Sequence, residues 1–248
     1  MTLVHRHHAD LLAAIQRAGG PRRQGNDHSD SYGSSGHPFY RVPVPVRRKI
    51  AKTWLASDRT RPTAEIIAVI ESLFAGESHE EKTLAALLLG YHRAARRQTG
   101  PADVDRWLDH LNGWAEIDTL CYGIYTAPEL LAGWADWENL LRRLSHAPDP
   151  NRRRAAIVLL TKPVHVCDDR RLRELAVETV DLLRRDPLVT KAISWLLRSM
   201  VTHHRDTVVG YLAAHEATLA AIVVRETRTK LATGTKRGRA PEVRSGLP

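Results

Sequence analysis

The stretch Ala147-Pro148-Asp149-Pro150-Asn151-Arg152-Arg153-Arg154-Ala155-Ala156-Ile157-Val158-Leu159-Leu160 decides the fold class. Two prolines mark a break in the chain, and three arginines then lead into a short apolar run. A run of this length fits the interior of a helix as well as a buried strand. Working outward, apolar residues recur at helical spacing between short breakers over most of the chain, and no segment favours a strand. We therefore interpret the stretch as a helix.

Ten helices are expected beyond residue 62, at 63–74, 79–97, 102–111, 114–122, 128–144, 152–160, 170–184, 188–202, 206–214 and 217–231. An N-terminal helix should end before Gly19-Gly20-Pro21, and another should begin near Pro45, where a missing N–H costs nothing. Many helices with short connections predict an all-α fold, an α-solenoid of stacked antiparallel helix pairs with a curved, basic face. A compact irregular helical bundle is the alternative.

The expected domain organisation is a single helical-repeat domain over residues 1–232. Within it, residues 22–41 are polar and rich in Gly and Ser, which predicts a loop or mobile lid. Residues 233–248 form a basic, Gly- and Pro-containing tail that is expected to be disordered and to add non-specific phosphate affinity.

The charge of the chain points to a polyanionic partner. The net charge is +9, and arginine, whose forked guanidinium suits phosphate oxygens, outnumbers lysine. Nucleic acid is the first partner to consider and an anionic membrane surface the second. No apolar run is long enough to span a bilayer, and the N-terminus lacks the apolar stretch of a secretory signal.

Cysteine and histidine usage indicates neither a disulfide framework nor a metal site. Only Cys121 and Cys167 are present, without metal-ligand spacing, so a reducing, cytoplasmic setting is expected. The cluster of His5, His7 and His8 is interpreted as a solvated helix start rather than a metal site. We expect no cofactor.

A candidate functional site lies at Trp114 and Asp118. These residues are four apart, so on a helix they project from the same face. An aromatic ring beside a carboxylate on a cationic protein could hold a positively charged group next to a polyanion. Packing plus a salt bridge is the alternative explanation of the same spacing. The other tryptophans of this region are expected to be core or helix-contact residues, namely Trp107, Trp134 and Trp137.

Four fragments of the sequence, in this order, resemble the DNA alkylation repair family, the AlkD-like alkylpurine DNA glycosylases built from HEAT-like helical repeats. The first is the tyrosine segment Ser31–Ser35 ahead of the proline-ended helix start Val42–Arg48. The second is the Trp-x-x-x-Asp helix at Trp114–Asp118. The third is the arginine-led helix Asn151–Val158, and the fourth is Lys191–Arg198, which carries a second tryptophan.

The resemblance implies a monomeric, cytoplasmic, nucleoid-associated DNA glycosylase that removes N3- or N7-alkylated purines from duplex DNA. It implies that Asp118 is the catalytic carboxylate and that Trp114 and Trp195 hold the sugar and backbone around the lesion. It implies an open concave surface for the lesion instead of a deep base pocket. It also implies DNA contacts from Tyr32, Arg47, Arg48, Arg153, Arg154 and Lys191. Which of Arg153 and Arg154 is the site arginine stays open.

The sequence departs from the family pattern at a few positions. Arg41 and Ser194 stand where glycine is usual. Because related branches include non-excising binders of DNA structures, a non-catalytic DNA binder is a second hypothesis. A HEAT-like scaffold whose basic face docks an acidic protein is a third. The preferred adduct, small or bulky, is not indicated.

Overall fold

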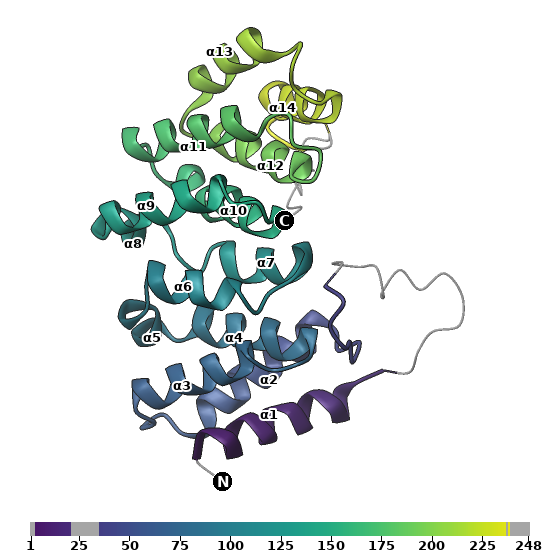
Figure 1. Ribbon diagram of the computed structural model, residues 1–248, viewed down its shortest axis with the longest axis vertical. Coiled ribbons are helices and arrows are strands. Elements are labelled where there is room, and N and C mark those ends of the chain that lie inside the picture. The colour runs from purple at the N-terminus through teal and green to yellow at the C-terminus, as the bar shows by residue number, and fades with distance from the viewer. Residues whose placement is uncertain (1–2, 21–34, 237, 239–248) are drawn as a thin grey trace, which may run out of the picture. The chain divides into compact units, whose positions relative to one another are not determined.

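The computed structural model describes residues 3–20, 35–236 and 238, and every regular element in this part of the chain is a helix (Figure 1). The prediction of an all-α fold is confirmed. The helices are α1 (Leu3–Ala18), α2 (Val44–Ser57), α3 (Thr63–Phe74), α4 (His79–Tyr91), α5 (Arg93–Gln98), α6 (Pro101–Leu108), α7 (Gly113–Cys121), α8 (Ala127–Ala132), α9 (Trp134–Ser145), α10 (Pro150–Val166), α11 (Arg170–Leu183), α12 (Thr190–Met200), α13 (Arg205–His215) and α14 (Ala221–Thr233). No helix in the described residues is both long and apolar enough to cross a bilayer.

The helices group into two compact units that divide within α9, the first ending at Leu141 and the second beginning at Arg142. In unit 1, α3 packs against α1 and α4, and α4 also packs against α2 and α7. Large aromatic side chains fill its core: the rings of Trp107 and Phe74 stack with centroids 4.9 Å apart, and Trp137 lies 4.9 Å from Tyr125. The predicted core roles of Trp107 and Trp137 are confirmed, whereas Trp134 is half-buried.

Unit 2 is arranged around α10 and α12, which pack against each other. The apolar run from Ala155 to Leu160, ambiguous in the sequence, is a helix with every residue buried. Because α10 packs against α11 as well as α12, that run has neighbours in two helices. An apolar helix with no polar stripe is expected at such a central position.

Two helices expected to be continuous are each divided in two. The predicted helix 79–97 breaks at His92, whose extended backbone (φ −102°, ψ 92°) leaves α4, while its Nδ1 accepts a hydrogen bond from Ala95 N–H and caps α5. The predicted helix 128–144 breaks at Gly133, between α8 and α9. The helix predicted at 152–160 is longer, since α10 continues through Pro163 to Val166. Pro163 lies in the last turn, where its missing N–H removes a single ladder bond.

The start of α4 is a buried polar junction. Ser78 caps the helix: its Oγ accepts from Glu81 N–H, and the Glu81 carboxylate accepts from Ser78 N–H at 2.8 Å. His8 of α1 bonds the same carboxylate at 2.7 Å and Ser72 at 2.6 Å. Burial opposes ionisation of Glu81, but the bonds from His8 and Ser78 outweigh it and lower its pKa. The predicted solvated helix start is therefore wrong for His8, which ties α1 to this junction.

The segment 35–43 is held to α4 by a buried carboxylate. Glu80 accepts hydrogen bonds from Tyr40 N–H at 3.0 Å and Val42 N–H at 3.1 Å. Between them, Arg41 has a φ of +61°, in the left-handed region that glycine adopts most easily. The two bonds to Glu80 keep Arg41 in that conformation.

We predict that Ser78→Ala lowers the free energy of unfolding by about 1–2 kcal/mol, because the N-terminal N–H groups of α4 lose their buried acceptor. Urea denaturation measures the effect. Ser57→Ala is the matched control, since this hydroxyl donates only to Trp54 C=O at the exposed end of α2. A loss for Ser78→Ala no greater than that of the control would show that the junction does not depend on the cap.

Candidate functional site

Helix α7 has one face buried in unit 1 and another face accessible to solvent. Ile117, Leu120 and Cys121 are fully buried against unit 1. Trp114 is 37% exposed and Asp118 is half-buried. The two residues lie one turn apart on the accessible side, as their spacing predicts. Trp114 is thus not a fully buried core residue, and its role at the site stays a prediction.

Asp118 lies in the wall of a cleft in unit 1. The cleft has a volume of about 430 Å³ and is formed by residues of α2, α4, α7 and the turn after α7. Arg47 and Arg48 of α2 line it together with Asp118, and so do the exposed rings of Tyr91 and Tyr122. The structure therefore brings the predicted catalytic carboxylate and two of the predicted DNA-binding arginines to one site.

A second carboxylate of α7, Glu116, points the other way and has no exposed side-chain surface. Its Oε1 accepts from His37 Nδ1 at 3.0 Å and from His79 Nδ1 at 3.1 Å, and its Oε2 accepts from Asn112 N–H at 3.0 Å. Burial opposes ionisation, but the bonds from His79, Asn112 and His37 outweigh it and lower the pKa of Glu116. The sequence analysis missed this residue, since only the fold brings His37 and His79 to it.

In unit 2, the two candidate arginines of α10 differ in their bonding. Arg153 Nε lies 2.7 Å from Asp186 Oδ2, and its Nη1 donates to the carbonyl groups of Ala147 and Pro148. Arg153 thus joins the turn before α10 to the loop after α11. Arg154, the next residue of the helix, is half-buried.

Helix α12 carries the remaining predicted residues of unit 2. Lys191 is exposed in its first turn, and Trp195, one turn later, is half-buried. Ser194, which replaces a glycine of the family pattern, is buried and donates to Glu226 of α14 at 2.6 Å. Glu226 also pairs with Lys236 at 3.4 Å. The serine therefore joins α12 to α14. Lys236, within the segment where the basic tail was expected, is likewise bonded to α14 through Glu226.

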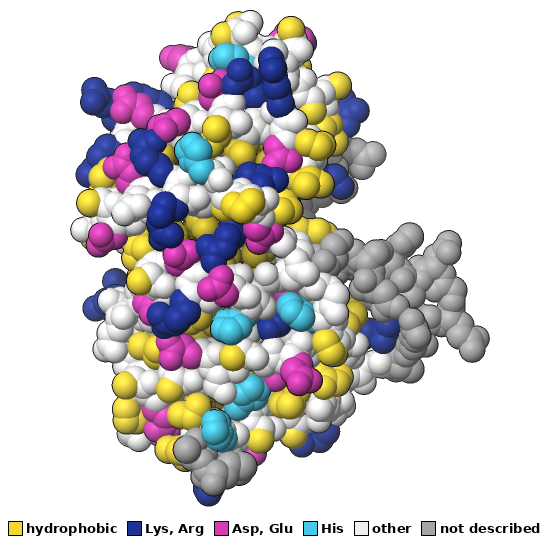
Figure 2. All heavy atoms as spheres, viewed as in Figure 1, with side chains coloured by type: hydrophobic (Ala, Val, Ile, Leu, Met, Phe, Trp, Pro, Cys, Tyr) yellow, Lys and Arg dark blue, Asp and Glu magenta, His cyan; other side chains and the backbone are white. Residues whose placement is uncertain are grey.

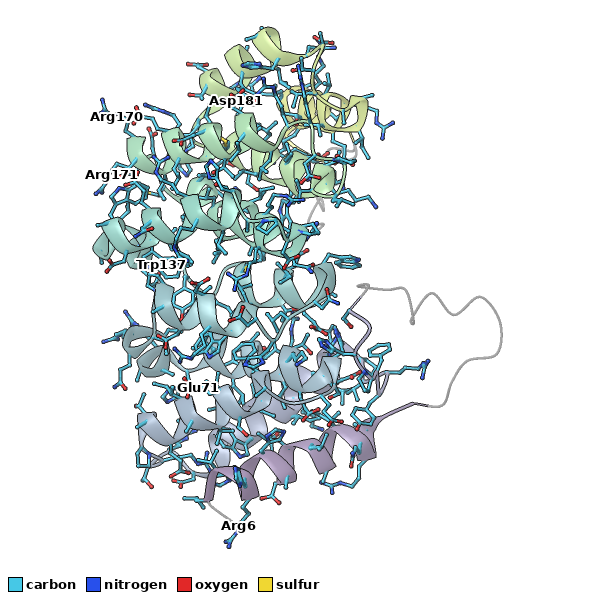
Figure 3. The ribbon with its side chains drawn as sticks, viewed as in Figure 1. Arg6, Glu71, Trp137, Arg170, Arg171 and Asp181 are labelled. Atoms are coloured by element: carbon cyan, nitrogen blue, oxygen red, sulfur yellow. The ribbon has the colours of Figure 1, made fainter. Side chains whose placement is uncertain are left out.

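Many of the other helix-end arginines are paired with carboxylates. Arg106 pairs with Glu71 and Asp103, Arg142 with Glu178, Arg170 with Glu174, Arg171 with Asp169, and Arg184 with Asp181. Figure 3 shows Arg170 and Arg171 at the beginning of α11. On the face seen in Figure 2, basic and acidic side chains are interspersed. The paired arginines are therefore poor candidates for binding phosphate.

Tyr32 and most of the predicted loop lie outside the described residues, as does most of the tail. The predicted concave basic face and the single domain over 1–232 stay predictions. Among residues 3–20, 35–236 and 238, no group of three or more His, Cys, Asp or Glu side chains is arranged to hold a metal ion.

One comparison with known proteins shows a family. The family model described as "DNA alkylation repair enzyme" matches residues 15–231. A solved structure described as a predicted DNA alkylation repair enzyme from Enterococcus faecalis is similar, with a TM-score of 0.63 and 16% identity, covering 84% of this chain and 97% of that one. At this identity the structural similarity shows the fold alone. Comparison with curated proteins finds no match.

We predict that removing Trp114 affects stability far less than removing a core tryptophan. Trp107 is 1% exposed, so Trp107→Ala should lower the free energy of unfolding by about 3–5 kcal/mol, whereas Trp114→Ala and Asp118→Asn should each change it by less than about 1 kcal/mol. Thermal or urea unfolding measures all three variants. A loss for Trp114→Ala as large as that for Trp107→Ala would make Trp114 a packing residue after all.

Proposed function

Because the chain belongs to the DNA alkylation repair enzyme family, we propose that it is a DNA glycosylase that releases N3- or N7-alkylated purines from duplex DNA. One observation carries this proposal: Asp118 and Trp114 lie on the accessible side of α7, and Asp118 shares a cleft with Arg47 and Arg48. A carboxylate, an indole and two guanidiniums are the groups that a cationic lesion in a polyanion requires.

The proposed reaction needs one carboxylate. An N3- or N7-alkylated purine is positively charged, so the bond between its glycosidic nitrogen and C1′ breaks with the electron pair leaving on the base. Positive, oxocarbenium-like charge then develops on the deoxyribose. The ionised carboxylate of Asp118 would stabilise this charge and orient the water whose oxygen adds to C1′ and whose proton is released. The leaving group is already cationic and needs no general acid.

The neighbouring side chains would hold the substrate. The indoles of Trp114 and Trp195 would contact the sugar and backbone around the lesion, and aromatic faces attract cations by about 0.5–2 kcal/mol. Arg47, Arg48, Arg154, Lys191 and Tyr32 would contact phosphates, which fixes the position of the duplex without reading its sequence. At Arg153 a phosphate would have to compete with the bonds to Asp186 and two carbonyl groups.

Asp118→Asn tests the catalytic role. With duplex DNA containing N7-methylguanine or N3-methyladenine, we expect base release to slow about 10²- to 10³-fold, since the neutral amide no longer stabilises the sugar cation. Asp136→Asn, an exposed carboxylate of α9, should release base at the rate of the unchanged protein. Release by Asp118→Asn at the same rate would remove Asp118 from the mechanism. DNA binding without any release by the unchanged protein would favour the non-catalytic hypothesis.

Arg153→Ala and Arg154→Ala should affect different properties, the first protein stability and the second DNA binding. Arg153→Ala leaves the partly buried Asp186 without its partner, so it should mainly lower stability. Arg154→Ala should mainly weaken DNA binding and reduce the slope of log K against log salt by about 0.9, as expected for one lost phosphate contact. Unfolding curves and DNA titrations at several salt concentrations separate the two effects. An unchanged slope for Arg154→Ala, with a reduced slope for Arg153→Ala, would reverse the assignment.

A further inference from the structure

Arg47 is an unusual residue for the wall of a cleft, because it is 8% exposed and yet charged. It lies on α2 in the fourth helical position, and burial lowers its pKa while the nearby Glu80 opposes that shift. A buried guanidinium normally requires partners for all of its N–H groups. In the described structure, however, its buried Nε has no hydrogen-bond partner.

Two side chains of α4 lie within hydrogen-bonding distance of the Arg47 guanidinium. Its Nη1 lies 3.3 Å from His79 Nε2 and donates to Thr83 Oγ1. Since a guanidinium can only donate, His79 Nε2 must be the acceptor of that bond. These two acceptors orient the guanidinium, and the nearby carboxylate of Glu80 partly compensates its positive charge. Arg106 shows the contrast, since it is paired with the carboxylates of Glu71 and Asp103.

Glu116 determines which nitrogen of His79 carries the proton. An ionised carboxylate can only accept, so His79 Nδ1, 3.1 Å from Glu116 Oε1, must donate. With the proton on Nδ1, Nε2 can accept from Arg47. The bonds therefore run in one direction, from Arg47 to His79 and from His79 to Glu116. The same carboxylate also accepts from His37 Nδ1 and Asn112 N–H.

We propose that the cleft between α2, α4 and α7 is a binding site for one DNA phosphodiester next to Asp118, with Arg47 as its buried anion-binding group and His79 and Glu116 as positioning residues. Only the identification of the polyanion as DNA rests on the proposed function. Among the residues that line the cleft, two guanidiniums outnumber one carboxylate, which suits the single negative charge of a phosphodiester. The exposed rings of Tyr91 and Tyr122 in the same wall would contact a sugar or base, which favours a nucleotide unit over a free anion.

The salt dependence of DNA affinity tests the site, with undamaged duplex DNA as the probe. Arg47→Gln should reduce the slope of log K against log salt by about 0.9, because one phosphate contact is lost. Arg47→Lys keeps the charge and should keep the slope. Arg106→Gln is the matched control, and since its carboxylate partners already compensate the arginine, the slope should not change. An unchanged slope for Arg47→Gln, in a protein whose unfolding curve shows that it is folded, would overturn the proposal.

Glu116→Gln tests the positioning role without touching the cleft. The amide has a single acceptor oxygen where three donors now bond the carboxylate, and its NH₂ group would drive His79 to the tautomer that cannot accept from Arg47. We expect DNA affinity at low salt to fall about 3- to 10-fold and the slope to decrease in the same direction as for Arg47→Gln. An equal loss of affinity at every salt concentration would mean that Glu116 acts only on stability.

Two further measurements complete the test. The first distinguishes a DNA phosphodiester from a free anion, and the second distinguishes failure of the phosphodiester site from failure of the glycosylase proposal. Inorganic phosphate, added at constant ionic strength, should not abolish the difference between the parent protein and Arg47→Gln. If it does, the cleft holds a free anion and the assignment to a phosphodiester is wrong. Base release is assayed on the same proteins. Release by the parent with no slope change in Arg47→Gln refutes only the phosphodiester site, whereas a slope change without release refutes only the glycosylase.

Discussion

The buried carboxylate of Glu116 is the constraint on which the functional face of unit 1 depends. A charge removed from water must be fully hydrogen-bonded, and the donors here come from three parts of the chain: His37, His79 at the start of α4, and Asn112 at the start of α7. Their bonds join these parts at one point. With Glu116 directed inward, the helical period directs Trp114 and Asp118 outward. The hydrogen bonds that hold Glu116 in the interior therefore also place Asp118 in the cleft.

The helical architecture could be predicted from the sequence because apolar spacing and prolines are local signals. The bounds of α3 were predicted without error, and the breaks before α6 and α10 lie where Gly100-Pro101 and the prolines of 148–150 indicate them. The break at His92 could not be predicted, because it depends on an imidazole turning back to cap the next helix. The extension of α10 through Pro163 was missed for a related reason. Tertiary packing, which a pattern does not show, keeps that last turn helical.

The candidate site could be predicted only in part from the sequence. A tryptophan and an aspartate four residues apart share a face on any helix, so their common orientation followed from spacing alone. Glu116 looked like one more solvated acid, because its partners His37 and His79 are far away in the chain. For the same reason Arg47 and Arg48 looked equivalent, although one is buried and the other exposed. Arg153 and Arg154 were likewise inseparable until the bond to Asp186 was seen.

The burial of Cys121 has a chemical consequence for a member of the DNA alkylation repair enzyme family. The agents that methylate purines are electrophiles, and a thiolate is among the best nucleophiles that a protein offers them. Cys121 follows Asp118 by three residues on α7 but faces the core and is fully buried. Its sulfur is therefore shielded from such electrophiles. Cys167 of unit 2 is only half-buried, so its thiol is the one that such reagents, or a fluorescent maleimide, would modify.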